Sequence, residues 1–132
     1  MAKGRQAHEA AKQALNRLGK DLSRRARSGC ELCGQSDGCK PHLVPPTGEE
    51  LDLDSAILAC PRCREALDSK RLPGNSDDYR FLETTIWAEI VPAQVAAIRL
   101  LRRLANDDVP WAREANEGLW LDDAIAERVE AS

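Results

Sequence analysis

Four cysteines in two pairs give this chain its clearest chemical signature. Two residues separate the thiols in each pair, which are Cys30 with Cys33 and Cys60 with Cys63. Two such pairs can close a tetrahedral shell of four thiolates around one cation, as in structural zinc sites. Because this shell leaves no coordination position for water or a substrate, we expect one Zn2+ ion with a structural role.

The alternative interpretations of these cysteines are two disulfides or two unrelated buried pairs. The chain has five cysteines, an odd number, and no apolar signal region follows its first residues. We therefore expect a cytoplasmic protein, whose reducing surroundings favour thiolate ligands over disulfides. The fifth cysteine, Cys39, is interpreted as a free loop thiol. No stretch is apolar enough to span a membrane, so we expect no membrane partner.

A histidine at the start of an apolar run indicates a second kind of chemistry. The run His42-Leu43-Val44-Pro45 resembles the histidine strand of HNH nucleases, in which the histidine activates water to attack a phosphodiester. The metal that assists such an attack needs its own ligands. The positions that supply them in that family hold Pro41, Ser55 and Arg64 in this chain. We therefore expect no catalytic residue, and His42 is the candidate only if the chain is a nuclease.

Charge is distributed unevenly along the chain. The net charge is -3, but residues 1–29 carry +6 and the remainder carries -9. Such an asymmetry indicates an end that faces a polyanion, although a solvated helix or an arm that binds an acidic protein surface explains it equally well. The side chains predicted to contact nucleic acid lie at this end and beside the second cysteine pair: Arg17, Lys20, Arg24, Arg25, Arg27, Arg62 and Arg64.

Hydrophobic periodicity predicts the elements that position these groups. Apolar residues recur at helical spacing over residues 5–27, at positions Ala7, Ala11, Leu15, Leu18 and Leu22. Two short apolar pieces, residues 42–44 and 57–59, flank turn residues and predict a β-hairpin. A helix is predicted over residues 64–71, with the last two cysteines at its start. A knuckle, a hairpin and a helix in this order are the treble-clef arrangement.

From residue 75 onward the pattern is helical. Ser76 or Asp77 is predicted to cap one helix, Pro92 to lie in the first turn of the next, and Pro110 to start a third. The last predicted helix covers residues 119–129 and turns four side chains inward, Leu121, Ala124, Ile125 and Val129. The three tryptophans are spread over separate segments and are predicted to lie in the core: Trp87, Trp111 and Trp120.

Several motifs, in one order, resemble the PhnA-like proteins. They are residues 25–34 and 57–65 around the two cysteine pairs, Val44-Pro45-Pro46, and residues 87–95 and 118–123. The resemblance implies a zinc-binding module whose ligands are Cys30, Cys33, Cys60 and Cys63. The chain departs from the family because it ends before the small β-barrel of longer members, and because it has a longer basic N-terminal helix and a histidine at position 42.

These patterns predict a small α+β zinc-bound module of treble-clef, HNH-like type followed by an α-helical region, mostly α overall. The predicted parts are a basic amphipathic helix (1–27), the zinc module (28–74) and a helical region packed on it (75–132). We predict a non-enzymatic zinc-binding protein that binds nucleic acid or another macromolecule through the basic helix. The alternatives are a metal-dependent HNH-like nuclease or phosphonate-linked hydrolase, and a protein-protein adaptor.

Overall fold

The first helix is the longest element of the protein. The computed structural model describes residues 2–131, with side chains from residue 9 onward except residue 11, and α1 spans Ala2–Ala26. Its Leu18 and Leu22 are buried, which confirms the helix and the later part of its apolar face. The side chains of Ala7 and Ala11, the first positions of that face, lie outside the described set.

The end of α1 is set by backbone conformation. Arg27 and Ser28 both adopt positive φ angles, 53° and 62°, which cannot continue a right-handed helix. The N-H of Ser28 donates to the carbonyl of Ser23 at 2.9 Å, and that of Gly29 donates to the carbonyl of Ala26 at 3.1 Å. These bonds satisfy carbonyls in the last turn and bring the chain directly to Cys30.

A β-hairpin follows, as predicted, with shifted bounds. β1 (Lys40–Leu43) pairs antiparallel with β2 (Ala56–Ala59), and His42 lies opposite Ile57. β1 begins before the predicted residue 42, because Lys40 and Pro41 extend the pairing without adding to the apolar pattern. Pro41 is tolerated because a strand in a two-stranded sheet has one unpaired edge.

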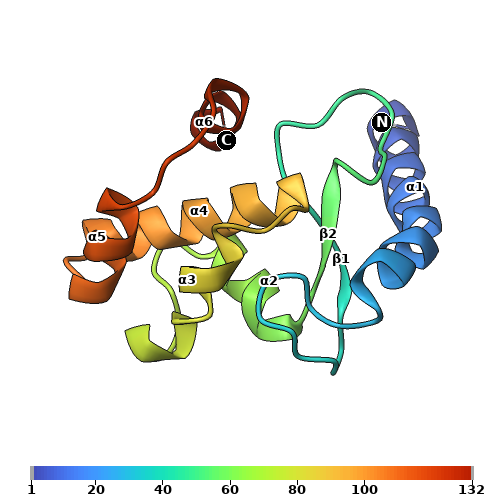
Figure 1. Cartoon of the computed structure of the whole chain (residues 1–132). Coiled ribbons are helices and arrows are strands. Elements are labelled where there is room, and N and C mark those ends of the chain that lie inside the picture. Colours follow the sequence, from blue (N-terminus) through green and yellow to red (C-terminus); the bar gives the residue numbers. More distant parts are fainter. Residues whose placement is uncertain (1, 132) are drawn as a thin grey trace.

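β2 supplies side chains to two separate clusters. Ile57 and Ala59 belong to the main core, whereas Ala56 and Leu58 pack with α1. This alternation follows from the two-residue period of a strand. Figure 1 accordingly shows α1 on one side of the hairpin and the remaining helices on the other.

The main core is organised around two helices that follow the hairpin. α2 (Pro61–Asp68) starts directly after Cys60, and α4 (Val91–Asn106) contacts β2 and α2. Pro92 lies in the first turn of α4, as predicted, and the helix stops at the predicted break. α4 is buried over more than one stripe, with Ala93, Val95, Ala96, Ala97, Ile98, Leu100, Leu101 and Leu104 inaccessible.

The C-terminal half differs from the sequence expectation first in the helix predicted after residue 75. The helix predicted after residue 75 consists of a 3-10 turn, η1 (Ser76–Tyr79), and a short helix, α3 (Leu82–Thr85). Its cap is Asn75, not Ser76 or Asp77.

The last two helices complete this half. α5 (Pro110–Glu117) starts at its predicted proline, and α6 (Asp123–Glu130) is capped by Asp122, whose side chain accepts from the N-H of Ile125. Ile125 and Val129 are buried as predicted, and Leu121 packs partly against the core from the segment before α6, but Ala124 in the first turn is exposed.

The prediction that all three tryptophans lie in the core is wrong for two of them. Trp87 is 52% exposed and Trp120 is 78% exposed. Both follow the end of a helix, where the chain turns and a large side chain is not constrained by helical periodicity. Trp111 packs partly against the core, and the guanidinium of Arg80 lies 5.5 Å from its ring centroid.

The fold class is confirmed at a coarse level. Residues 2–131 are mostly helical, with a small two-stranded sheet and a cluster of four cysteines. None of the helices in this range combines the length and the apolar character needed to cross a membrane.

Candidate metal centre

The first cysteine pair lies in a tight turn built by backbone hydrogen bonds. The N-H of Cys30 donates to the carbonyl of Gln35 at 2.8 Å, and the N-H of Gly34 donates to the carbonyl of Cys30 at 2.9 Å. Gly34 has a φ of 87°, a conformation that residues with a side chain rarely adopt. The N-H groups of Leu32 and Cys33 approach the Cys30 sulfur at 3.4 and 3.5 Å, so the turn directs donors at this sulfur.

The second pair lies at the start of α2. Cys60 is the residue before the helix and Cys63 lies in its first turn, as the treble-clef order predicts, although α2 covers residues 61–68 and not the predicted 64–71. Helix N-termini carry partial positive charge, which favours thiolates placed there. Pro61 suits the first helical position, where no intrahelical N-H bond is needed.

The four sulfur atoms form one compact group. All four lie within 4.8 Å of one another, and the sulfurs of Cys33 and Cys60 are 3.6 Å apart. A tetrahedral ion with metal-sulfur bonds of about 2.3 Å would hold its sulfurs about 3.8 Å apart. The donor set therefore fits a single tetrahedral metal ion, with Cys30, Cys33, Cys60 and Cys63 as its ligands.

The electrostatics of the cluster also favour a cation. The interaction between the Cys63 and Cys30 side chains lowers the pKa of Cys30 and raises the pKa of Cys63. Burial raises the pKa of Cys33. Negative charges this close repel, so the four groups ionise together only when a cation compensates them.

Cys39 lies close to the cluster but does not belong to it. Its thiol donates to the carbonyl of Gln35 at 3.1 Å, and its pKa is raised by burial and by the negative charge of Cys30 and Cys60. A raised pKa keeps the sulfur protonated, so neither ligation nor nucleophilic attack is favoured. This surrounding agrees with the interpretation of Cys39 as a free thiol.

A buried carboxylate between the first two cysteines joins the site to α1. Glu31 accepts bonds from the Nε and Nη2 of Arg25 at 2.9 and 2.8 Å and from the N-H of Leu58 at 2.9 Å. Arg25 also donates to the carbonyls of Leu53 and Ala56. Sequence reasoning missed this link, because the pattern placed Arg25 with the other basic residues of the helix.

A second contact joins the turn to the C-terminal half. The hydroxyl of Thr85, at the end of α3, donates to the carbonyl of Leu32 at 2.6 Å. Both residues are buried, so the bond satisfies polar atoms that water cannot reach. No signal in the sequence indicated this pairing, which spans two of the predicted parts.

The seven predicted nucleic-acid contacts do not gather on one surface. Four of them are exposed on and just beyond α1, namely Arg17, Lys20, Arg24 and Arg27. Arg62 is exposed across the hairpin from α1, and its guanidinium lies 5.9 and 6.0 Å from the ring centroids of Tyr79 and Phe81. Arg25 is engaged with Glu31. Arg64 donates to the carbonyls of Ala59 and Gly38 at 3.2 and 3.0 Å.

His42 lies away from the cysteine cluster. Its Nε2 is 3.3 Å from a carboxylate oxygen of Asp68, and its side chain is 19% exposed. Burial lowers the pKa of His42 below its usual value, although Asp68 opposes this effect. Within the described residues, the cysteines form the one group of three or more potential metal ligands, and His42 is not part of it.

Comparison with known proteins found no match. No family model, curated protein or solved structure matches the chain.

Proposed function

We propose that this protein is a non-enzymatic binding module in which one structural Zn2+ ion fixes a treble-clef arrangement and α1 contacts the phosphates of nucleic acid. The turn at Cys30, the β1-β2 hairpin and the start of α2 follow one another in the order of that arrangement. The resemblance to the PhnA-like proteins is part of the proposal and points to the same four ligands.

The observation that carries the proposal is the cluster of four sulfurs. Four thiolates at tetrahedral separation suit Zn2+ and leave no open position on the metal, which favours a structural role. A catalytic zinc site keeps one position for water. Elemental analysis of protein purified without added metal should find about one Zn2+ per chain; iron in its place would overturn the zinc assignment.

The basic surface of α1 supports the choice of partner. We call Arg17, Lys20, Arg24 and Arg27 the α1 basic face. These side chains are exposed, and none of them is within ion-pair distance of a carboxylate in the described part of the chain. Unpaired, solvated cations on a rigid helix can approach phosphates without first breaking an internal contact.

A salt titration tests the nucleic-acid contact. Fluorescence anisotropy of a labelled duplex and a labelled single strand should report binding that weakens as salt rises. Replacing the four residues of the α1 basic face with glutamine should reduce the slope of log K against log salt by up to about 0.9 per lost duplex contact. The control replaces four exposed cations of the body with glutamine: Lys40, Lys70, Arg71 and Arg113, of which Arg113 is ion-paired with Asp108.

The same experiment separates the competing functions. Equal salt slopes for both variants, or no binding at all, would contradict the proposed surface. A protein-protein adaptor would retain partners after nuclease treatment and lose them in the α1 variant. A nuclease would cleave the labelled strands when Mg2+ or Mn2+ is added, and His42→Ala would abolish that cleavage.

A further inference from the structure

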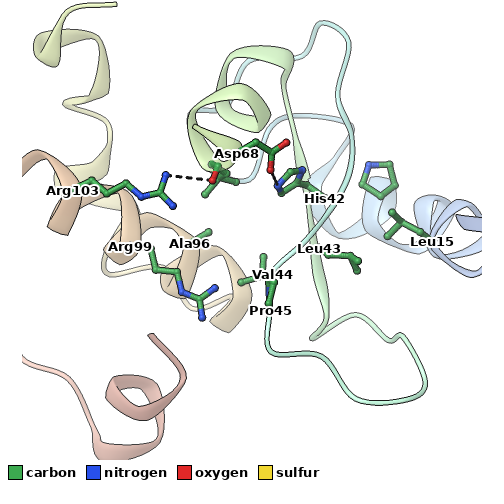
Figure 2. Close-up of a pocket in the computed structure, with 11 residues that line it drawn as sticks. Leu15, His42, Leu43, Val44, Pro45, Asp68, Ala96, Arg99 and Arg103 are labelled. Atoms are coloured by element: carbon green, nitrogen blue, oxygen red, sulfur yellow. Dashed lines mark hydrogen bonds and ion pairs between the residues drawn. The ribbon is translucent and has the colours of Figure 1, made fainter. Parts of the chain in front are cut away.

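A cavity lies between β1, α2 and α4, and Leu15 of α1 also lines it. Its volume is about 480 Å3, within the range of small-molecule sites. Apolar side chains form most of its wall, among them Leu43, Val44 and Leu67. Figure 2 shows Arg99 and Arg103 projecting from α4 at this cavity, while His42 and Asp68 pair beside it.

The two arginines have spare hydrogen-bonding capacity. Arg99 donates through Nε to the carbonyl of Val129 at 3.2 Å and through Nη2 to that of Arg128 at 2.6 Å. Arg103 donates through Nη1 alone, to the carbonyls of Ala66, Leu67 and Ser69. Among the described residues, Nη1 of Arg99 and both Nε and Nη2 of Arg103 have no hydrogen-bond partner.

Positive charge in this region is not fully compensated. Neither arginine forms an ion pair with a described carboxylate, and the carbonyls that they contact belong to the last turns of α6 and α2. A helix C-terminus offers only about half a negative charge. Burial, and then the proximity of Arg128 and Arg103, lowers the pKa of Arg99, as expected where like charges gather.

The acidic group at this cavity does not remove the excess. Asp68 is directed at His42, and its side chain is 71% exposed, so water screens much of its charge. Arg128 is already paired with Asp54 at 2.8 Å. Half-buried cations generally have a counter-charge, and the cavity has space for one beside an apolar wall.

We propose that this cavity binds a small organic anion. A carboxylate or phosphate head accepts hydrogen bonds from Arg99 and Arg103, whose planar groups match such oxyanions. The apolar body of the ligand packs against Leu43, Val44 and Leu67. The site is separate from the α1 basic face and does not depend on the proposed binding of nucleic acid.

Calorimetric titration of the full metal-loaded chain tests the cavity. The probes are phenyl phosphate and benzoate, which carry the two possible heads, with inorganic phosphate and neutral benzyl alcohol for comparison. One of the two aromatic anions should bind saturably, with a Kd below about 10 mM. The better head identifies the ligand class, and binding weaker than this for both anions would overturn the proposal.

Three variants locate the binding. Arg99→Gln should weaken it at least about tenfold, because a charge-assisted hydrogen bond is lost. Asp68→Asn should strengthen it about two- to fivefold, since an exposed negative charge near the anion is removed. Arg102→Gln, on the same helix but outside the cavity, should leave it unchanged.

The Asp68 variant keeps the test decisive if the Arg99 variant unfolds. A gain in affinity for Asp68→Asn supports the site, and an unchanged or weaker affinity contradicts it. Amide signals of Leu43, Val44 and Ala96 should shift on titration, whereas shifts confined to α1 would show that the anion binds the basic face instead. If inorganic phosphate bound as tightly as phenyl phosphate, the proposed contact between the ligand and the apolar wall would be contradicted.

Discussion

The five cysteines are chemically alike in the sequence and differ in what surrounds each sulfur. Cys30, Cys60 and Cys63 are buried with their sulfurs facing one another, while Cys39 is bonded to a carbonyl outside this group. The C-x2-C spacing singled out the four clustered residues because it requires two sulfurs to face one point. It correctly set Cys39 apart, since that residue has no partner at the same spacing.

Replacing single cysteines distinguishes the clustered cysteines from Cys39. Cys63→Ser should lose the metal and fold poorly, because a neutral hydroxyl is a weak ligand for Zn2+ and the site supplies folding energy. Cys39→Ser should keep about one metal ion per chain and an unchanged melting temperature. Elemental analysis and thermal unfolding check both, and a Cys63→Ser protein with normal metal content would contradict the four-sulfur site.

His42 should make stability depend on pH. Burial holds its pKa below the reference value of 6.5, so the unfolded chain takes up the proton first as the pH falls. Stability therefore decreases from near pH 6.5 downward, until the folded protein is also protonated.

The pH effect is measured by comparison with His42→Gln. Chemical denaturation of both proteins between about pH 7.5 and 5.5 should show a steeper loss for the wild type. Loss of metal in acid affects both proteins and cancels in the comparison. Parallel curves would mean that His42 takes up its proton equally well in the folded and unfolded states.

At the scale of elements, α1 shows where sequence patterns stop being informative. Periodicity predicted the helix and buried Leu18 and Leu22, but the charge of this end of the chain alone grouped Arg25 with Arg24 as a nucleic-acid contact. Adjacent residues on a helix point about 100° apart. Arg24 faces water, whereas Arg25 reaches the buried Glu31. Which of the two arginines forms the ion pair depends on where the cysteine turn lies, and the helical pattern does not contain that information.

These two neighbours make a matched test of how α1 is attached. Arg25→Ala should destabilise the metal-loaded protein by about 2–4 kcal/mol, because it leaves the carboxylate of Glu31, 5% exposed, without its cation. Arg24→Ala should change stability by less than about 0.5 kcal/mol. Denaturant unfolding followed by circular dichroism gives both values, and similar losses would contradict a specific role for Arg25.

The short elements after residue 75 were predicted less accurately than α1. Phe81, Leu82 and Ile86 suggested one continuous helix, yet the backbone forms a 3-10 turn and then α3. The reason is tertiary: the chain is shaped to bring the Thr85 hydroxyl to the carbonyl of Leu32 and Tyr79 into the core. Local propensity is easily overridden in segments this short.

At the scale of the whole molecule, the cysteine cluster and the C-terminal helices share one core. The same cluster of buried side chains includes Cys30 and Cys63, Leu101 of α4 and Val129 of α6. The predicted division at residue 74 stays a prediction about sequence organisation. Packing in the structure is continuous across it.

Removal of the metal should therefore affect more than the cysteine turns. Chelation is expected to unfold the hairpin, α2 and the C-terminal helices in a single transition, because they share buried contacts. Hydrogen exchange of α4 amides, measured with and without chelator, checks this. Protected α4 amides after complete metal loss would show that residues 75–131 are stable on their own.

β2 imposes a restriction on how this chain can change in length. Both of its faces serve as interior walls, one toward α1 and the other toward α4. Inserting or deleting one residue inside Ala56–Ala59 would exchange the two sets of side chains. Residues 45–50 of the connection between the strands have no such constraint, since they are exposed and longer loops cost little. Natural variants should accumulate insertions in that connection and keep the four-residue frame of the strand intact.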